Sequence, residues 1–349
     1  MNPPRHGGGV LAASAQFGIP PEEWLDLSTG INPDAYPVPA IPEDYFRRLP
    51  ETDTPEFNDA VRRYYGGRYF VAAGGSQRFI EVLPRLRPTC RVAVPDVGYR
   101  EHAYHWRRCG HHIVSYNGFD PLQLEPLIEA GRIDVAVLIN PCNPTGARVP
   151  RERLEQWRDR LDRRGGWLII DEAFIDPSPG DSAAAISHRP GVVVLRSLGK
   201  FFGLAGIRVG FAMAGEAITQ CLAAAVGPWA VTGPSMVVAT QALADTEWQQ
   251  CNRERLHEGS AWLADTLQQA LGPAIVERAV TPLFVSLVVA EDFAQRVFTH
   301  LAESGILVRL WPLADSRPGL ALLRFGLVGA GDGDGRRRVR DVLRSLAAA

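Results

Sequence analysis

The chain has 349 residues, with 46% apolar and 22% charged residues, a composition typical of globular proteins that excludes a largely disordered chain. Lys and Arg together number 37 and Asp and Glu 39, so the formal net charge is −2. This balance gives no electrostatic reason to expect a nucleic-acid or anionic-membrane partner. The length leaves room for about two domains.

The sequence predicts a cytoplasmic protein with no membrane partner. No apolar run approaches the roughly 20 residues that a membrane-spanning helix needs. Residues 1–9 lack the basic region and following apolar stretch of a secretory signal. The cysteines are odd in number and widely spaced, which predicts reduced thiols; they are Cys90, Cys109, Cys142, Cys221 and Cys251.

A large α/β domain is predicted from short apolar runs that alternate with helical patterns. Strands are expected at residues 69–73, 91–94, 112–115, 135–139, 167–170, 192–195 and 208–213. Helices are expected near 76–87, 99–109, 121–130 and 150–164. Several strands are rich in Val and Ile without polar alternation, as in parallel strands that are buried on both faces. The alternation favours a doubly wound sheet covered by helices.

A smaller α+β domain is expected toward the C-terminus. A helical pattern covers residues 235–271, with room for one break that the pattern does not locate. Strands are expected at 284–289, 306–310 and 320–325, and helices near 291–304 and 335–346. The first fifty residues contain nine prolines and no evident sheet of their own. We therefore predict an N-terminal segment, residues 1–48, that packs on the small domain or a partner subunit, a large domain at 49–235 and a small domain at 236–349.

Polar side chains follow several of the predicted strands, where ligands of open α/β sheets bind. Residues 74–77, Gly-Gly-Ser-Gln, open a helix and could hold a phosphate, although a plain tight turn explains them equally well. Residues 140–146 contain two Asn-Pro pairs, which indicates a rigid loop that positions an amide. Asp171 ends a buried strand, so its carboxylate either meets a partner or caps a helix.

Lys200 lies among glycines and aromatic residues after the strand at 192–195, and Arg208 follows eight residues later. A desolvated lysine amine can attack a carbonyl, although a single lysine is more often a loop or surface residue. The strand ends together supply phosphate donors, an amide, a carboxylate, a lysine and an arginine. These are the groups that a pyridoxal phosphate (PLP) site requires.

Residues 140–146, 171–174 and 197–210 resemble the motifs of fold-type I PLP enzymes of the class I/II aminotransferase superfamily. The resemblance covers nearly the whole chain and implies a mostly parallel seven-stranded sheet between helices, with a smaller α+β domain. Within the superfamily, residues 6–8, 26–33, 171–176 and 323–327 resemble threonine-phosphate decarboxylases of cobalamin biosynthesis. These are near relatives of the histidinol-phosphate aminotransferases.

The resemblance also implies roles for individual residues around the cofactor. Lys200 would form the Schiff base and then shuttle protons, and Asp171 would hold the pyridine nitrogen protonated. Asn143 would bind the phenolic oxygen, with a cis peptide to Pro144, and Tyr99 would stack on the ring. The cofactor phosphate would be held by Gly75, Ser76, Gln77, Ser197 and Arg208.

For the substrate, the resemblance implies that Arg324 binds the carboxylate in a bidentate fork. Gly30, Asn32 and Asn143 would lie close to it, and His6 would help to bind a substrate phosphate. Two positions depart from related sequences. Phe174 stands where many have a tyrosine that bonds the phenolic oxygen, and Leu49 stands where the broader pattern has a tyrosine that reaches the neighbouring subunit's cofactor.

The implied reaction is decarboxylation of L-threonine O-3-phosphate to (R)-1-aminopropan-2-yl phosphate by a homodimer. The main alternative is an aminotransferase for histidinol phosphate or another small amino acid. A non-catalytic protein of the same fold is disfavoured by intact Lys200, Asp171 and Arg208, and a nucleotide-binding protein would rest on residues 74–76 alone. The cluster of His102, His105, Cys109, His111 and His112 matches no zinc framework, so no metal site is expected.

Overall fold

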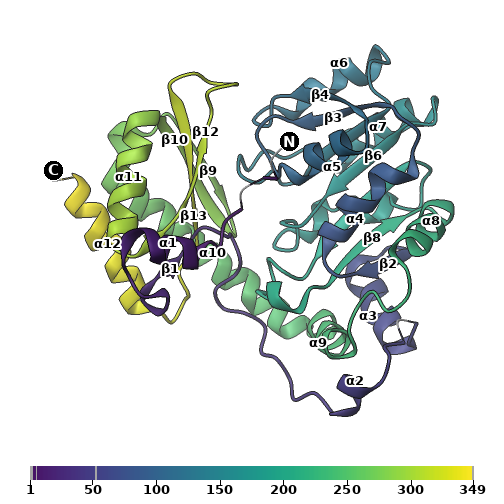
Figure 1. Ribbon diagram of the computed structural model, residues 1–349, viewed down its shortest axis with the longest axis horizontal. Coiled ribbons are helices and arrows are strands. Elements are labelled where there is room, and N and C mark those ends of the chain that lie inside the picture. Colours follow the sequence, from purple (N-terminus) through teal and green to yellow (C-terminus); the bar gives the residue numbers. More distant parts are fainter. Residues whose placement is uncertain (1–2, 5, 52, 348–349) are drawn as a thin grey trace. The chain divides into compact units, whose positions relative to one another are not determined.

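The structure, a computed structural model, describes residues 3–4, 6–51 and 53–347. The chain forms two compact units. As far as these residues are described, the first combines Met1–Pro4 with Ala35–Gln249, and the second combines Arg5–Asp34 with Gln250–Ala349. Figure 1 shows the elements with the labels used below.

The first unit is organised around a seven-stranded sheet. In spatial order its strands are β2 (Phe70–Ala73), β8 (Gly210–Ala214), β7 (Val192–Ser197), β6 (Trp167–Asp171), β5 (Val135–Ile139), β3 (Arg91–Pro95) and β4 (His112–Tyr116). Only β8 runs antiparallel to its neighbours. The structure thus confirms the predicted mostly parallel sheet.

Helices pack against both faces of this sheet, as Figure 1 shows. They are α3 (Pro55–Tyr65), α4 (Ser76–Val82), α5 (Glu101–Arg108), α6 (Leu124–Glu129), α7 (Arg151–Asp162) and α8 (Glu216–Val226). Helix α9 (Gly233–Ala244) packs against α3, and the short α2 (Asp44–Arg47) packs against α9. All five residues of β5 are buried, as its unbroken apolar run predicts for a central parallel strand. Trp106 on α5 and Trp157 on α7 are fully buried in the core.

The second unit contains a four-stranded antiparallel sheet and a two-stranded parallel one. The larger sheet has the order β12 (Arg309–Pro312), β13 (Leu320–Gly326), β10 (Phe284–Ala290) and β9 (Glu277–Thr281). In the smaller sheet, β1 (Leu25–Asp26) pairs with β11 (Ile306–Leu307). The helices are α1 (Val10–Phe17), α11 (Glu291–Glu303) and α12 (Gly333–Ala347), together with most of α10 (Thr246–Leu271).

Three predicted elements differ from the structure in informative ways. The helical pattern at 235–271 breaks at Asp245, whose Oδ1 accepts a hydrogen bond from the Trp248 N–H at 2.9 Å and so caps α10. The strand expected at 306–310 is two strands, β11 and β12, in different sheets. The strand expected at 208–213 begins at Gly210, because Arg208 adopts a left-handed backbone conformation with φ of 52°.

Strand β9 was not predicted at all. It begins with two exposed charged residues, Glu277 and Arg278, and pairs only with β10 at the edge of its sheet. Such a strand lacks the apolar run that predicts the other long strands, and the two-residue strand β1 was not predicted either. Within the described residues, no helix combines the length and hydropathy needed to cross a bilayer.

Candidate active site

The candidate site is formed where the parallel strands β5, β6 and β7 end. In the sheet register Ile139 lies opposite Asp171, and Asp171 lies opposite Leu195. The loop after β5 and the segment from Ser197 to Lys200 therefore begin on either side of Asp171. Three groups of predicted cofactor residues, distant in sequence, are brought to one edge of the sheet.

The Asp171 carboxylate is buried and held from two sides. Its Oδ2 lies 2.9 Å from His102 Nε2, and its Oδ1 accepts a hydrogen bond from the Ala173 N–H at 3.1 Å. The side chains of His102 and Asp171 are 1% and 5% exposed, so this contact is shielded from water. Asp171 thus has the partner that a buried carboxylate needs.

His102 was considered in the sequence only as a member of a histidine cluster. The structure instead makes it the partner of Asp171, from the first turn of α5. Its spacing of three residues from Tyr99 corresponds to one helical turn, but no spacing in the sequence indicates its contact with Asp171. Among the described residues, no three His, Cys, Asp or Glu side chains are placed to hold a metal ion.

Replacing His102 by Phe is expected to lower kcat about 10- to 100-fold, because a hydrogen bond to a buried charged group is lost. Steady-state kinetics measure the effect, with His112→Gln as a control at an exposed position on β4. A wild-type kcat in the His102 variant would contradict this role.

The loop after β5 is rigid for a reason the sequence did not single out. Asn140 and Val149 exchange two hydrogen bonds, Asn140 Nδ2 to the Val149 carbonyl at 3.0 Å and the Val149 N–H to Asn140 Oδ1 at 2.9 Å. The peptides preceding Pro141 and Pro144 are both cis. Asn140 therefore anchors the loop, while Asn143 is half-buried on it as the amide expected at the cofactor.

The predicted phosphate loop is shaped by close backbone approaches. Gly75 has φ of +87°, and a Cβ there would lie 2.6 Å from the Arg208 guanidinium. A Cβ on Gly210 would lie 2.2 Å from the Ser76 backbone nitrogen. Arg208 also donates to the Gly74 carbonyl at 3.4 Å and to the Ala205 carbonyl at 3.1 Å. Only glycine permits this packing, which sets an exposed guanidinium beside a helix N-terminus, a combination suited to phosphate.

Lys200 follows β7 on a turn. It is half-buried, with its Nζ 5.3 Å from the centre of the Phe174 ring, and the Gly199 N–H donates to Ser197 Oγ at 3.1 Å. Lys200 is also the only lysine among the chain's 37 Lys and Arg residues. Arginine supplies charge but no nucleophilic amine. That it is the single lysine is a stronger signal for Lys200 than the motif around it.

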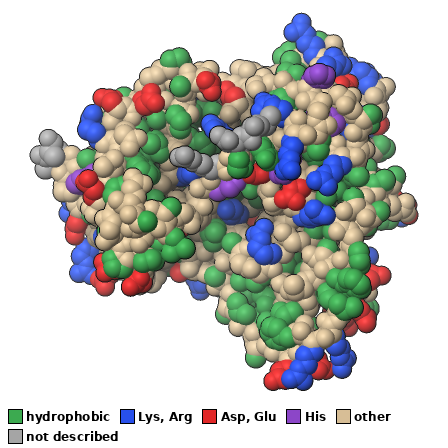
Figure 2. Space-filling model, in the orientation of Figure 1, with side chains coloured by type: hydrophobic (Ala, Val, Ile, Leu, Met, Phe, Trp, Pro, Cys, Tyr) green, Lys and Arg blue, Asp and Glu red, His purple; other side chains and the backbone are tan. Residues whose placement is uncertain are grey.

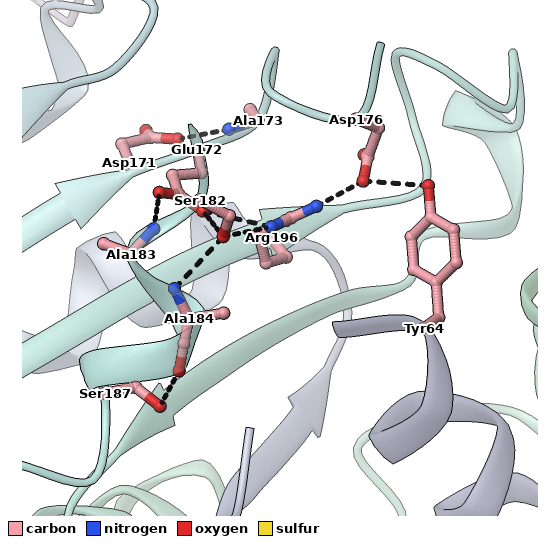
Figure 3. A network of polar contacts seen from close by, with 10 residues as sticks. All are labelled: Tyr64, Asp171, Glu172, Ala173, Asp176, Ser182, Ala183, Ala184, Ser187 and Arg196. Carbon is pink, nitrogen blue, oxygen red and sulfur yellow. Dashed lines mark hydrogen bonds and ion pairs between the residues drawn. The ribbon is translucent and has the colours of Figure 1, made fainter. Parts of the chain in front are cut away.

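A buried ionic network joins the ends of β6 and β7 (Figure 3). Arg196 on β7 donates to Glu172 Oε2 at 3.0 Å, to Ser182 Oγ at 2.8 Å and to Asp176. The Tyr64 hydroxyl donates to the same Asp176 oxygen at 3.1 Å. Burial alone would lower the pKa of Arg196, but Asp176 and Glu172 raise it well above the usual value. The network ties the residue after Asp171 to the residue before Ser197.

In the second unit, Arg324 lies on β13 and is 3% exposed. Its guanidinium carbon is 5.1 Å from the Trp311 ring centre and 5.6 Å from that of Phe284, and the guanidinium donates to the Ser28 carbonyl. Burial and the nearby Arg309 lower the pKa of Arg324 to about 9. A buried cation under such repulsion is stabilised by an anion.

Arg309 is a second basic residue that the sequence analysis overlooked. It lies directly opposite Arg324 in the register of β12 and β13. Its guanidinium donates to the His6 carbonyl at 3.0 Å and lies 5.0 Å from the Trp311 ring centre. Nothing in the spacing of the two arginines could reveal the pair, since only strand pairing brings them together.

Three further residues that the sequence predicts at the site, His6, Gly30 and Asn32, belong to the second unit. The exposed His6 is tied to Arg309 through its backbone, and the Gly8 N–H donates to Ser28 Oγ at 2.7 Å. Gly30 is buried with φ of +62°. Asn32 is also buried, and its amide donates to the Asp34 carbonyl at 2.9 Å and to Asn252 Oδ1 at 3.0 Å.

Known proteins resemble this chain in sequence and fold. A family model, aminotransferase class I and II, matches residues 22–314. The chain is 43% identical to a threonine-phosphate decarboxylase of Pseudomonas aeruginosa, with 92% of each chain covered, and 36% identical to one of Sinorhizobium sp., with 97% of each covered. A solved structure of histidinol-phosphate aminotransferase from Sinorhizobium meliloti, in complex with pyridoxal-5'-phosphate, has a TM-score of 0.79 at 19% identity, covering 99% of this chain and 96% of its own. This last likeness concerns the fold.

Proposed function

The chain belongs to the class I and II aminotransferase family, and we propose that it is a PLP-dependent decarboxylase of L-threonine O-3-phosphate. The products are CO2 and (R)-1-aminopropan-2-yl phosphate, and the pathway is cobalamin biosynthesis. The observation that carries the proposal is the identity of 43% and 36%, over almost the whole chain, to two proteins named threonine-phosphate decarboxylase.

The residues of the first unit fit PLP. Gly75 leaves the space that Arg208 fills beside the phosphate loop, Asp171 is a buried carboxylate held in place, and Lys200 is the only lysine. When bound, the cofactor withdraws the electron pair that bond cleavage leaves at the substrate α-carbon. Gly75, Ser76, Gln77, Ser197 and Arg208 are proposed to hold its phosphate.

The chain's own groups are proposed to do the following. Lys200 attaches the cofactor and afterwards returns a proton to the α-carbon. Asp171, supported by His102, keeps the ring nitrogen protonated. Asn143 donates to the phenolic oxygen, and Tyr99 covers the ring. Phe174 carries no hydroxyl, so the phenolic oxygen receives no hydrogen bond from that position.

The second unit is proposed to bind the two anionic groups of the substrate. Arg324 takes the carboxylate, and Arg309, its neighbour across the strand pair, adds a second guanidinium for the substrate's negative charge. Gly30 and Asn32 shape the segment near Ser28, and His6 is proposed to contribute to phosphate binding. The mutual repulsion of the two arginines is relieved when an anion binds.

Replacing Arg324 by Ala is expected to raise the KM for threonine phosphate about 10- to 100-fold, because a charge-assisted bidentate contact is lost. The effect on kcat is expected to be smaller. Initial-rate kinetics measure both, with Arg278→Ala on the exposed edge strand β9 as a matched control. An unchanged KM in the Arg324 variant would assign the carboxylate to another residue.

Release of CO2 distinguishes the decarboxylase from the aminotransferase alternative. The purified protein with bound PLP is incubated with L-threonine O-3-phosphate and no keto acid, and CO2 is measured. Stoichiometric CO2 and aminopropanol phosphate are expected. Absence of CO2, together with turnover of histidinol phosphate that depends on a keto acid, would establish the alternative.

We also propose a homodimer that acts in the cytoplasm. Large apolar side chains are exposed on the first unit, including Val38 at 60%, Phe46 at 66%, Leu49 at 67% and Trp229 at 57%. Figure 2 shows hydrophobic side chains at the surface of this unit around α2, α3 and α9. A second copy would cover such a surface. Sedimentation equilibrium tests this, and a monomer at micromolar concentration would refute the dimer.

A further inference from the structure

A chain of polar side chains connects the first turn of α5 with the predicted phosphate loop. The Tyr99 hydroxyl donates to Gln77 Oε1 at 2.9 Å, and Gln77 Nε2 donates to Glu101 Oε2 at 3.1 Å. The same Glu101 oxygen lies 3.0 Å from His105 Nε2. In Figure 1, α5 lies beside α4, the helix that carries Gln77.

Glu101 determines the direction of the hydrogen bonds in this chain. A carboxylate only accepts hydrogen bonds, so the Gln77 atom that faces it must be the NH2 group. Glu81 Oε1 is 3.5 Å from the same nitrogen, at the outer limit of a hydrogen bond, so Glu101 is the nearer and stronger acceptor. The Gln77 oxygen is then turned toward Tyr99, and the Tyr99 hydroxyl must donate its proton to it.

Burial strengthens the hydrogen bonds among Glu101, Gln77 and Tyr99, because little water competes for them. Glu101 is 6% exposed, and Tyr99 is half-buried. Burial first, and then the charge of Glu101, raise the pKa of the Tyr99 hydroxyl well above its usual value, so it stays protonated and acts as a donor. Without Glu101, the Gln77 amide could turn over and present its NH2 group to Tyr99.

We propose that Glu101 is a positioning residue for the cofactor: by orienting the Gln77 amide, it fixes the Tyr99 hydroxyl and thereby holds the Tyr99 ring where it covers PLP. The proposal rests on the proposed function, which assigns Tyr99 to the cofactor ring. Two adjacent residues of α5 would then position groups at the cofactor: Glu101 positions Tyr99, and His102 positions Asp171.

The test compares PLP binding in Glu101→Ala, Glu101→Gln and Glu81→Gln. The dissociation constant of PLP is measured by titrating apoprotein, and the induced circular dichroism of the bound cofactor reports its orientation. Glu101→Ala is expected to weaken binding about tenfold and to reduce the dichroic band, since one charge-assisted hydrogen bond is lost. Glu101→Gln retains an acceptor oxygen and is expected to stay within about threefold of wild type. The control Glu81→Gln is expected to stay within about twofold, because Glu81 is one-third exposed and pairs with Arg78.

A Tyr99→Phe background separates positioning from a general structural effect. If Glu101 acts through Gln77 and Tyr99, Glu101→Ala should weaken PLP binding less than about twofold when the hydroxyl is absent. The full tenfold loss in that background, or wild-type binding and dichroism in Glu101→Ala alone, would overturn the proposal. If Glu101→Ala does not fold, a Glu101→Met variant, which keeps most of the side-chain volume but has no acceptor oxygen, is compared in the same two backgrounds with the same expected results.

Failure of this proposal differs from failure of the proposed function. A wild-type protein that does not bind PLP refutes the proposed function before any variant is compared. A wild-type protein that binds PLP but releases no CO2 changes the assigned reaction and leaves the role of Glu101 open to the same titrations.

Discussion

Replacing Lys200 by Ala is expected to lower kcat by at least about a thousandfold, because the amine that we propose attaches the cofactor and moves the proton is removed. The chain has no second lysine that could substitute for it. Reduction of the holoprotein with borohydride, followed by peptide mass spectrometry, should place the PLP adduct of the wild type on Lys200. The variant should carry no adduct on any side-chain amine.

Lys200→Arg is the matched variant, since it keeps the positive charge and removes the nucleophilic amine. It is expected to be as inactive as Lys200→Ala. Decarboxylation at more than about a tenth of the wild-type rate in either variant would contradict the assignment of Lys200 as the essential acid–base amine.

Replacing Arg196 by Ala is expected to reduce the free energy of unfolding by about 3–5 kcal/mol, because Glu172 and Asp176 would be left buried without their cation. Both carboxylate side chains are 0% exposed and Arg196 is 2% exposed. Urea denaturation of the apoprotein, followed by circular dichroism, measures the loss from the shift of the transition midpoint.

The control for Arg196 is Arg148→Ala. Arg148 pairs with Asp181 at 3.3 Å, but their side chains are 35% and 61% exposed. Its removal is expected to cost less than about 1 kcal/mol. A loss of the same small size in Arg196→Ala would show that water reaches the two carboxylates and that the network does not hold β6 against β7.

Much of the first unit could be predicted from the sequence because its signals are local. The central strands are largely apolar runs, and Asp171 at the end of β6 and Lys200 after β7 lie where parallel strands present side chains to a ligand. The edge strand β9 and the division of residues 306–310 between two sheets were not predicted. Both depend on which strands pair with each other, and the local pattern of apolar residues does not show this.

The supporting residues of the candidate site could not be predicted in the same way. His102 meets Asp171 across 69 positions of sequence, and Glu101 reaches Gln77 across 24. Arg309 faces Arg324 only through the register of two antiparallel strands. The members of such pairs have no fixed spacing along the sequence, because each contact depends on how whole helices and strands pack together.

The sequence by itself determined the α/β fold, the strand ends that carry polar groups and the identity of Lys200 as the single lysine. These properties follow from hydrophobic periodicity and from residue identity, which a linear chain displays directly. Only the tertiary structure decided which charges are buried and paired: Asp171 with His102, Arg196 with Glu172, and Gln77 with Glu101. The physical reason is that burial and hydrogen-bond partners are properties of packing, and they become defined only when distant segments exclude water together.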